Sequence, residues 1–332
     1  MRAALPGLTA SARKARLVRA YLAGAPVHCT WQLSPRCESF CHLCEHRAEA
    51  AAEELDTAGC ERVAEALAHE EALLVTFTGS EPFLRSDLPA ILSAVARRHF
   101  PLLVTNGWLV TPANARAAWQ AGLEAATVAF EDADPARHDA ATGMPGSHAR
   151  AVAALAALSR GRTRRSQRVN LRMRLRDPLA EGLPGLLELA RAHEATVTVE
   201  AAYPLPKLDG EAAGLVGRLR ELKRRFPNLR TSSSLIDRLG SALQGGVPGC
   251  LAGRAFFNVD HRGRVSKCLE FRQPADRVGS LASESLARIR PHLRALAAAN
   301  DCQACFYASR AEVETLYTLR GLLDGLGALV RA

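Results

Sequence analysis

The sequence is poor in aromatic residues and lysines, and it has no long apolar run. Aromatic residues make up 5% of the 332 residues, and lysine occurs only at positions 14, 207, 223 and 267. The longest apolar stretches, such as Ala151–Leu158, are much shorter than the roughly 20 residues that a membrane-spanning helix needs. The N-terminus has no unbroken apolar segment typical of a secretory signal. We therefore expect a globular protein of the cytoplasm, where thiols stay reduced.

The net charge is +9, and nearly all of the positive charge is arginine. Basic residues concentrate in Ser159–Arg168 and in Arg218–Arg225. Such stretches are usually solvated faces. No aromatic residue is interleaved with the arginines of the first stretch, so the stacking surface that binds single strands is absent there. Nucleic acid is therefore not an expected partner, and no transmembrane segment is expected either.

Short apolar runs alternate with helical patterns along the first two thirds of the chain. The expected strands are Val27–Leu33, Leu73–Thr78, Leu102–Thr105, Thr127–Glu131, Val169–Leu175 and Thr196–Ala202. The expected helices cover 57–69, 86–98, 112–121, 147–159, 180–194 and 211–226, with helix-start signals at Asp87, Pro112 and Ser147. Six β/α units predict a parallel sheet with helices outside. Because six strands are too few to close an eight-stranded barrel, we predict an α/β fold with an open, partial (β/α)6 barrel of the TIM type.

Two segments flank this barrel. Residues 9–23 predict a basic amphipathic helix that covers one barrel end, with contact to a membrane surface as an alternative. No further clear β/α unit follows after about residue 228. Instead, Phe256–Val259 and Arg264–Cys268 flank a turn with Gly263, which predicts a β-hairpin, and a helix follows from about Arg310. We divide the chain into an N-terminal helix (1–25), the barrel (26–228) and a C-terminal domain (229–332).

Three cysteines follow the first expected strand with the spacing C-x3-C-x2-C, namely Cys37, Cys41 and Cys44. An odd number of cysteines cannot pair completely as disulfides, and three thiolates are one short of a tetrahedral zinc site. They suit an iron–sulfur cluster, which is normally held by thiolates. With three ligands for four irons, one iron stays open for a substrate or cofactor.

Four more cysteines lie in the C-terminal domain. Cys250 and Cys268 flank the expected hairpin, and Cys302 and Cys305 form a C-x2-C pair. Four thiolates of this spacing predict a site for zinc or for an iron–sulfur cluster, and the residues leave both open. Cys29 has no such partner spacing and is expected in the core, and Cys60 likewise lacks a ligand-like spacing.

Polar residues follow the ends of several expected strands, where β/α barrels carry their chemistry. The triplet follows the first strand, Thr78–Pro82 the second and Thr105–Gly107 the third. These loops are therefore expected at one rim of the barrel.

Further polar residues are expected on the same rim or in the lumen. Glu131 and Asp132 end the fourth strand and Tyr203 ends the sixth; they are candidate catalytic residues, with solvated or packing roles as the alternative. Arg172 and Arg174 alternate with apolar residues along the fifth strand, which places them in a polar lumen. There they bind an anion or form ion pairs.

The chain resembles the radical S-adenosylmethionine (radical SAM) superfamily, whose signature is strand one followed by C-x3-C-x2-C. The resemblance implies that Cys37, Cys41 and Cys44 hold a [4Fe–4S] cluster and that SAM chelates its fourth iron. Reduced cluster then cleaves SAM to a 5′-deoxyadenosyl radical, which abstracts hydrogen from the substrate. The resemblance also places SAM contacts at Gly79, Ser80, Glu81, Pro82 and Asn106.

Two of these motifs match the family with departures. Gly79–Pro82 resembles the GGEP motif, with Ser80 where glycine is usual. Val128–Gly146 resembles the pattern of the branch with C-terminal auxiliary clusters, but Ala129, Glu131 and Thr142 replace its usual serine, aspartate and arginine. Arg172 or Arg174 would bind the SAM carboxylate instead, because a guanidinium matches a carboxylate.

The C-terminal domain resembles the twitch domain, a shortened SPASM extension. The resemblance implies one auxiliary [4Fe–4S] cluster on Cys250, Cys268, Cys302 and Cys305. Full ligation by protein leaves no open iron, which favours electron transfer over substrate binding.

The expected function is a radical SAM oxidoreductase or modifying enzyme acting on a small molecule, with the auxiliary cluster accepting an electron. The single auxiliary cluster resembles that of a radical dehydrogenase acting on an aminocyclitol. A peptide-modifying maturase is the alternative, against which we weigh the roughly 26 residues before the first strand, too few for a folded leader-binding module. Flavodoxin or ferredoxin is the expected electron donor. An alternative of another class is a non-catalytic iron–sulfur or zinc protein that senses redox state or binds a partner.

Overall fold

The computed structural model describes residues 7–37, 53–69, 73–175, 180–201, 211–270, 274–303 and 305–316. Of the predicted site residues, Cys41, Cys44 and Tyr203 lie outside these ranges.

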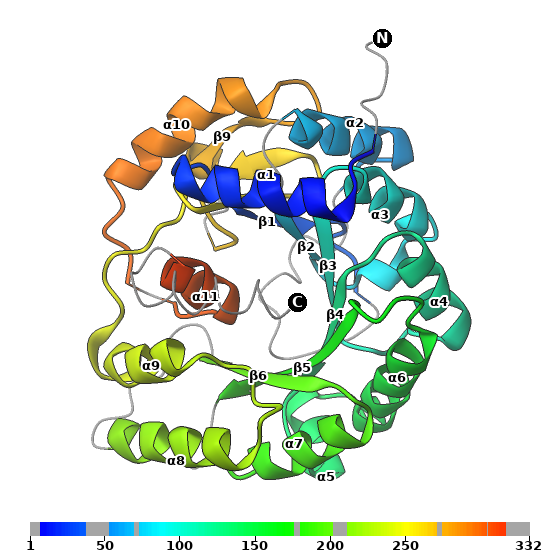
Figure 1. Ribbon diagram of the computed structural model, residues 1–332, viewed down its shortest axis with the longest axis vertical. Coiled ribbons are helices and arrows are strands. Elements are labelled where there is room, and N and C mark those ends of the chain that lie inside the picture. The colour runs from blue at the N-terminus through cyan, green and yellow to red at the C-terminus, as the bar shows by residue number, and fades with distance from the viewer. Residues whose placement is uncertain are drawn as a thin grey trace.

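Six parallel strands form the centre of the molecule, and each pairs with the next in chain order. They are β1 (His28–Gln32), β2 (Leu74–Thr78), β3 (Phe100–Thr105), β4 (Ala125–Phe130), β5 (Arg168–Leu175) and β6 (Thr196–Ala201). Outside them lie α2 (Thr57–Ala68), α3 (Leu88–Ala96), α4 (Pro112–Gln120), α6 (Ser147–Gly161), α7 (Leu183–Ala192) and α8 (Ala212–Arg225) (Figure 1). The predicted open, partial (β/α)6 barrel is confirmed.

Helix-start signals of the sequence lie where two of the helices begin, and one of these helices has a side-chain capping hydrogen bond. Asp87 precedes the first residue of α3, and Thr111 caps α4 by accepting a hydrogen bond from the backbone N–H of Asn114. Proline follows Thr111 at the first helical position, where its missing N–H costs nothing. A short helix that the sequence pattern did not predict, α5 (Pro135–Thr142), lies between β4 and α6 and ends at Gly143 in a left-handed conformation.

Alternation along the strands separates the core from the lumen. On β1, Cys29 and Trp31 are fully buried in the main core, while Thr30 faces the cavity inside the barrel. Cys60 of α2 belongs to the same core, and burial raises the pKa of its thiol to about 11. Both cysteines therefore pack as small apolar residues, as expected for Cys29 from the sequence.

The C-terminal segment contains more regular structure than the sequence pattern predicted. The hairpin of β7 (Phe256–Val259) and β8 (Arg264–Ser266) is present as predicted, and β9 (Arg277–Ser280) extends it. Two helices were missed, α9 (Ser233–Gly245) and α10 (Leu286–Ala298). In α10 the interior Pro291 interrupts the helical pattern, and proline inside a helix normally argues against one.

The hairpin does not stand apart from the barrel. β7 pairs in parallel with β1, so the sheet runs β6-β5-β4-β3-β2-β1-β7-β8-β9. The last described helix, α11 (Ala308–Leu316), contacts β6 and α9 and lies between β6 and the hairpin (Figure 1). The cysteine-bearing C-terminal segments are therefore brought to the open side of the barrel. The division of the chain near residue 228 stays a prediction.

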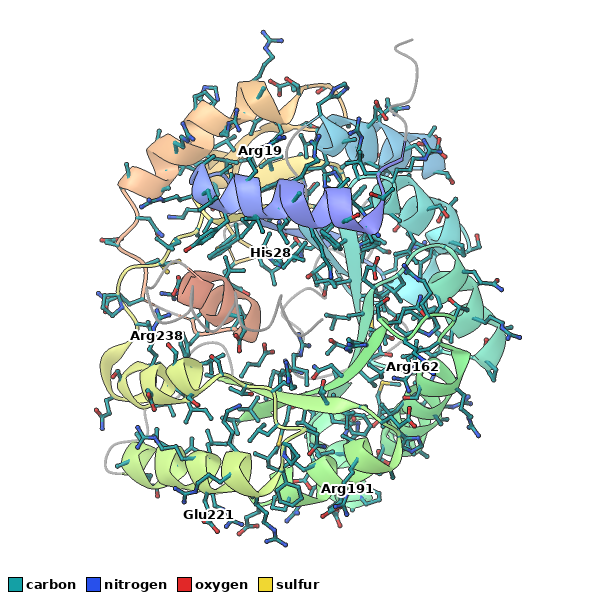
Figure 2. All side chains as sticks on the ribbon, viewed as in Figure 1. Arg19, His28, Arg162, Arg191, Glu221 and Arg238 are labelled. Carbon is teal, nitrogen blue, oxygen red and sulfur yellow. The ribbon has the colours of Figure 1, made fainter. Side chains whose placement is uncertain are left out.

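Helix α1 (Ala10–Leu22) is bound to the N-terminal ends of strands β3 and β4, opposite the strand ends that carry the predicted site loops. The buried Arg13 donates hydrogen bonds to the carbonyl of His99 (2.7 Å) and to Glu124 (2.9 Å), which lie at the starts of β3 and β4. Figure 2 places His28 in the interior beneath α1, whereas Arg191 and Glu221 lie on the periphery. Among the described helices, none combines the length and apolar character needed to cross a membrane.

Candidate active site

A cavity of about 700 Å³ lies inside the barrel and reaches the C-terminal segment. Both cysteine-bearing regions contribute to its wall. The predicted site residues that line it are Cys37, Gly79, Ser80, Asn106, Glu131, Arg172, Arg174, Cys250, Cys268, Cys302 and Cys305. Residues that are far apart in the sequence therefore line one cavity.

The loop after β2 packs against the segment that leads to Cys37. Gly79 has φ +115°, and a Cβ on it would lie 2.6 Å from the carbonyl oxygen of Ser34, so only glycine fits. The Ser80 N–H donates to the Ser34 carbonyl (3.1 Å), and its hydroxyl donates to the Pro35 carbonyl (2.7 Å). The serine that replaces the motif's usual glycine thus holds the loop against the chain that carries the first cysteine.

Glu81 is fully buried and lies behind this loop instead of lining the cavity. Its carboxylate accepts hydrogen bonds from the hydroxyl of Thr105 and the backbone N–H of Asn106, both at 2.9 Å. The amide of Asn106 in turn lies 3.7 Å from the Sγ of Cys37. Pro82 begins a short 3-10 helix and is also absent from the cavity wall. Glu81 thus joins the loops after β2 and β3, and Asn106 connects them to the thiol of Cys37.

The residues around Cys37 fit a cluster with SAM beside it. The half-buried thiol of Cys37 lines the cavity together with the polar side chains of Ser80 and Asn106. Thiolate is the normal ligand of iron–sulfur clusters. Ligation by the three cysteines of the triplet stays a prediction, since two of them lie outside the described residues.

The two lumen arginines are paired with carboxylates. Arg174 approaches the Oε1 of Glu131 with two nitrogens, at 2.6 and 3.1 Å. The Nε of Arg172 lies 3.2 Å from the Oε1 of Glu200. Both glutamates are buried, so each pair places compensated charge in the lumen. A contact of either arginine with the SAM carboxylate stays a prediction beside these ion pairs.

The candidate catalytic residues occupy different places. Glu131 lines the cavity, and its backbone N–H donates to the Nδ1 of His138, which also lines it. Asp132 is absent from the cavity wall, and its carboxylate is 3.0 Å from Arg137 on α5. This placement agrees with the packing alternative for Asp132.

The four C-terminal cysteines come from three segments. Cys250 precedes β7, Cys268 follows β8, and Cys302 and Cys305 lie between α10 and α11. The described residues contain no three His, Cys, Asp or Glu side chains gathered closely enough to hold a single metal ion. A four-iron cluster takes one thiolate per iron, so its ligands surround it instead of meeting at one point. Four half-buried thiols that line one cavity fit such an auxiliary cluster, which stays a prediction.

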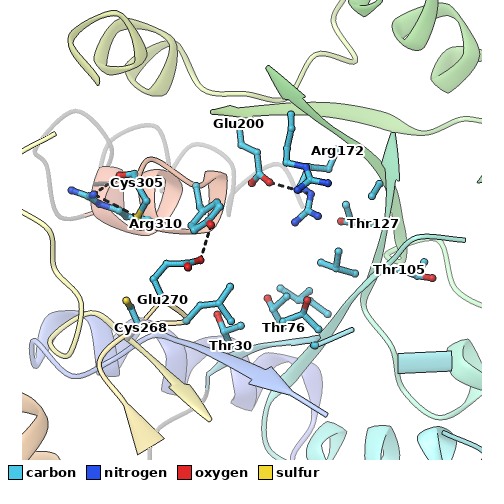
Figure 3. A pocket seen from close by; sticks show the side chains of 18 of the residues that line it. Thr30, Thr76, Thr105, Thr127, Arg172, Glu200, Cys268, Glu270, Cys305 and Arg310 are labelled. Atoms are coloured by element: carbon cyan, nitrogen blue, oxygen red, sulfur yellow. Dashed lines mark hydrogen bonds and ion pairs between the residues drawn. The ribbon is translucent and has the colours of Figure 1, made fainter. Parts of the chain in front are cut away.

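Sequence reasoning missed four polar residues near these cysteines. The hydroxyl of Tyr307 donates to Glu270 at 2.6 Å, and the ammonium of Lys267 donates to the side chain of Asn300 at 2.9 Å. Burial and the neighbouring carboxylate raise the pKa of Tyr307. Figure 3 shows Glu270 together with Arg172 and Glu200 among the residues that line the cavity. Tyr307 and Glu270 each lie two residues after a cysteine, a signal that could have indicated them.

Known proteins resemble this chain in sequence. Residues 31–170 match the family model described as the Radical SAM superfamily. The chain carries a radical SAM domain. The matched family implies a [4Fe–4S] cluster and SAM as the cofactors of this domain.

Two curated relatives carry the name PqqA peptide cyclase. The protein of Gluconobacter oxydans is 34% identical over 136 residues, which cover 40% of this chain and 38% of that protein. The protein of Granulibacter bethesdensis is 25% identical over 256 residues, covering 71% of this chain and 66% of that protein. This chain thus spans less than two thirds of the length of either relative.

Solved structures share the fold. SuiB of Streptococcus suis bound to S-adenosylmethionine superposes with a TM-score of 0.63 at 12% identity, covering 83% of this chain and 67% of SuiB. SuiB bound to its precursor peptide SuiA superposes with a TM-score of 0.61 at 12% identity, covering 92% of this chain and 77% of SuiB. At such low identity, these similarities establish the radical SAM fold alone.

Proposed function

We propose that this radical SAM enzyme modifies a peptide. The curated relatives are named for a peptide cyclase reaction, and SuiB shares the fold and binds a precursor peptide. The comparisons thus favour the maturase alternative over the small-molecule dehydrogenation expected first from the sequence.

The observation that carries the proposal is the shared cavity. Cys37 and the four C-terminal cysteines all line it. Cys37, Cys41 and Cys44 would hold a cluster that would supply the electron for SAM cleavage, and Cys250, Cys268, Cys302 and Cys305 would hold an auxiliary cluster that could accept one. A substrate in this cavity would be within reach of both sites.

The chain's own residues would bind and orient the reactants. Ser80 and Asn106 offer polar groups beside Cys37, and Gly79 lets the backbone approach closely there. The Arg172–Glu200 and Arg174–Glu131 pairs present both signs of charge to whatever enters the lumen. The described part of the cavity has a volume in the range that suits one ligand, roughly 300–1,000 Å³. Because SAM alone takes up much of this volume, we propose that only the reacting peptide side chain enters beside it, while the peptide backbone stays at the rim.

A product assay tests the proposal. The reconstituted protein is incubated anaerobically with SAM, dithionite or reduced flavodoxin, and synthetic peptides encoded by short reading frames beside its gene. We expect 5′-deoxyadenosine together with a peptide of changed mass, and deuterium from a labelled peptide in the 5′-deoxyadenosine.

The Cys37→Ala variant is the control and should form neither product. If peptides stay unmodified while small alcohols transfer deuterium to 5′-deoxyadenosine, the peptide proposal is wrong and the small-molecule reaction is right.

A further inference from the structure

Arg310 lies beside the proposed auxiliary site, and its side chain is almost fully buried, with 3% exposed. Its Nη1 is 3.9 Å from the Sγ of Cys305 and also donates to the backbone carbonyl of that residue. Its Nη2 donates to the carbonyl of Val247 at 2.9 Å. Figure 3 shows the guanidinium directed at Cys305. One side chain therefore holds the end of α9 and the C-x2-C segment and also reaches a thiol.

Glu314, one turn further along α11, fixes the direction of this guanidinium. Its Oε1 accepts from the Nε of Arg310 at 2.8 Å and from the backbone N–H of Leu251 at 3.1 Å. Its Oε2 accepts from Arg238 at 2.6 Å. A buried carboxylate held on both sides restricts the rotamers of Arg310. The guanidinium is thus positioned before any ligand binds.

We propose that Arg310 is a positioning residue that donates a hydrogen bond to the Cys305 thiolate and raises the reduction potential of the auxiliary cluster. The proposal rests on the auxiliary cluster of the proposed function. Reduction adds one negative charge to a cluster, and a nearby cation with an N–H donor stabilises the reduced form more than the oxidised form. Hydrogen bonds to ionised groups are also the stronger ones.

The alternative is that Arg310 only braces the carbonyls of Val247 and Cys305. That role would change protein stability without changing the cluster's potential. Arg238 offers a matched control, because it binds the same Glu314 and lies over the Phe306 ring, 5.1 Å from its centroid. Removing Arg238 takes away one cation of the network and leaves Arg310 beside the thiol.

The test measures the potential of the auxiliary cluster alone. In a background with Cys37, Cys41 and Cys44 replaced by Ala, the full chain is reconstituted anaerobically and titrated with monitoring by electron paramagnetic resonance. We expect Arg310→Met to lower the potential by roughly a tenfold change in the one-electron reduction equilibrium, about 59 mV. Arg238→Met should shift it much less. Equal shifts, or none in Arg310→Met, overturn the proposal.

A second measurement tests the proposal even if the Arg310→Met variant does not bind the cluster. The background protein is made with guanidino-15N arginine, and the reduced cluster is probed by electron–nuclear double resonance. We expect coupling to an arginine nitrogen, and its absence overturns the proposal.

Iron content separates the two failures. If the background protein binds no iron instead of about four irons, the auxiliary cluster of the proposed function is wrong, and the role of Arg310 falls with it. If it binds about four irons and the potential is insensitive to Arg310, only the inference about Arg310 is wrong.

Discussion

The two cysteine sites are each fixed by one buried charged side chain, and the two charges are opposite. Behind the loop that faces Cys37, the carboxylate of Glu81 accepts hydrogen bonds from Thr105 and Asn106 and joins two barrel loops. Beside Cys305 the guanidinium of Arg310 donates to carbonyls and joins the end of α9 to the C-x2-C segment. A carboxylate can only gather donors, and a guanidinium can only gather acceptors.

This difference bears on what each site can do. We call the site around Cys37 the front site and that of the four C-terminal cysteines the rear site. At the front site the buried carboxylate of Glu81 accepts from backbone and hydroxyl donors and does not line the cavity. At the rear site the guanidinium of Arg310 lines the cavity and lies near the Sγ of Cys305. A cation beside thiolates favours a cluster that accepts electrons. We therefore expect the electron donor to reduce a cluster at the front site, and the substrate to pass an electron to a cluster at the rear site.

The largest expected effect is the loss of all SAM cleavage when the front site is broken. The Cys37→Ala variant leaves one iron of the predicted cluster without its thiolate, so 5′-deoxyadenosine should fall to background in a dithionite assay. The Cys60→Ala variant is the matched control, because Cys60 is buried in the core and should leave the activity intact. Equal losses in both variants would mean that Cys37 has no special role.

A smaller effect is expected at the rear site. The Cys302→Ala variant should lose about four irons and retain part of its SAM cleavage, because the front site is intact. Iron analysis and a 5′-deoxyadenosine assay check this together. A variant that keeps all of its iron, or that loses SAM cleavage as completely as Cys37→Ala does, contradicts the division of labour between the two sites.

Replacing the buried carboxylate at the front site should weaken both folding and SAM binding. In Glu81→Gln an amide faces the Thr105 hydroxyl and the Asn106 N–H, so we expect a loss of about 2 kcal/mol in the free energy of unfolding and roughly tenfold weaker SAM binding. Urea unfolding and equilibrium binding measure these quantities.

The control for this variant is Glu124→Gln, which disturbs the ion pair with Arg13 at the opposite end of the barrel. It should reduce stability without changing SAM affinity. If it weakens SAM binding to the same extent, Glu81 acts through global stability alone.

The smallest effect concerns the barrel that both sites share. Burial lowers the pKa of His28 to about 4 and that of His99 to about 3, below the unfolded value of about 6.5. As the pH falls below 6.5 the unfolded chain binds protons that the folded chain does not, so the free energy of unfolding falls. Each histidine should lower the free energy of unfolding by about 1 kcal/mol as the pH falls from 6.5 to 5.5.

Chemical denaturation across this pH range checks the expectation. The His28→Gln variant should show a shallower pH dependence, while replacement of the exposed His292 on α10 should leave it unchanged. If His28→Gln keeps the full slope, burial of that imidazole does not govern the acid sensitivity of the barrel.

Much of the barrel was predictable because its signals are local. Short apolar runs located six strands to within a few residues, and Asp87, Pro112 and Ser147 located three helix starts. α9 and α10 were missed because α9 carries internal serines and a glycine and α10 contains Pro291, which weaken a helical pattern. Packing against neighbouring elements overrides such weak local preferences.

The site was predictable in its residue types and not in its contacts. Cysteine spacing and strand ends indicated which residues meet around the cavity. The inward turn of Glu81 and the pairing of Arg172 with Glu200 depend on neighbours distant in sequence. Tyr307 and Glu270 were missed for the same reason, because their pairing joins the segments after β8 and α10.

The sequence by itself determined the six β/α units, the predicted hairpin and the two sets of cysteines, because periodicity and spacing are written in neighbouring residues. Only the tertiary structure decided that β7 pairs with β1 and that α11 lies on the open side of the barrel. Those contacts bring both cysteine sets to one cavity. They also place Arg310 against Cys305 and Val247, since hydrogen bonding and burial act between groups that only the folded chain brings together.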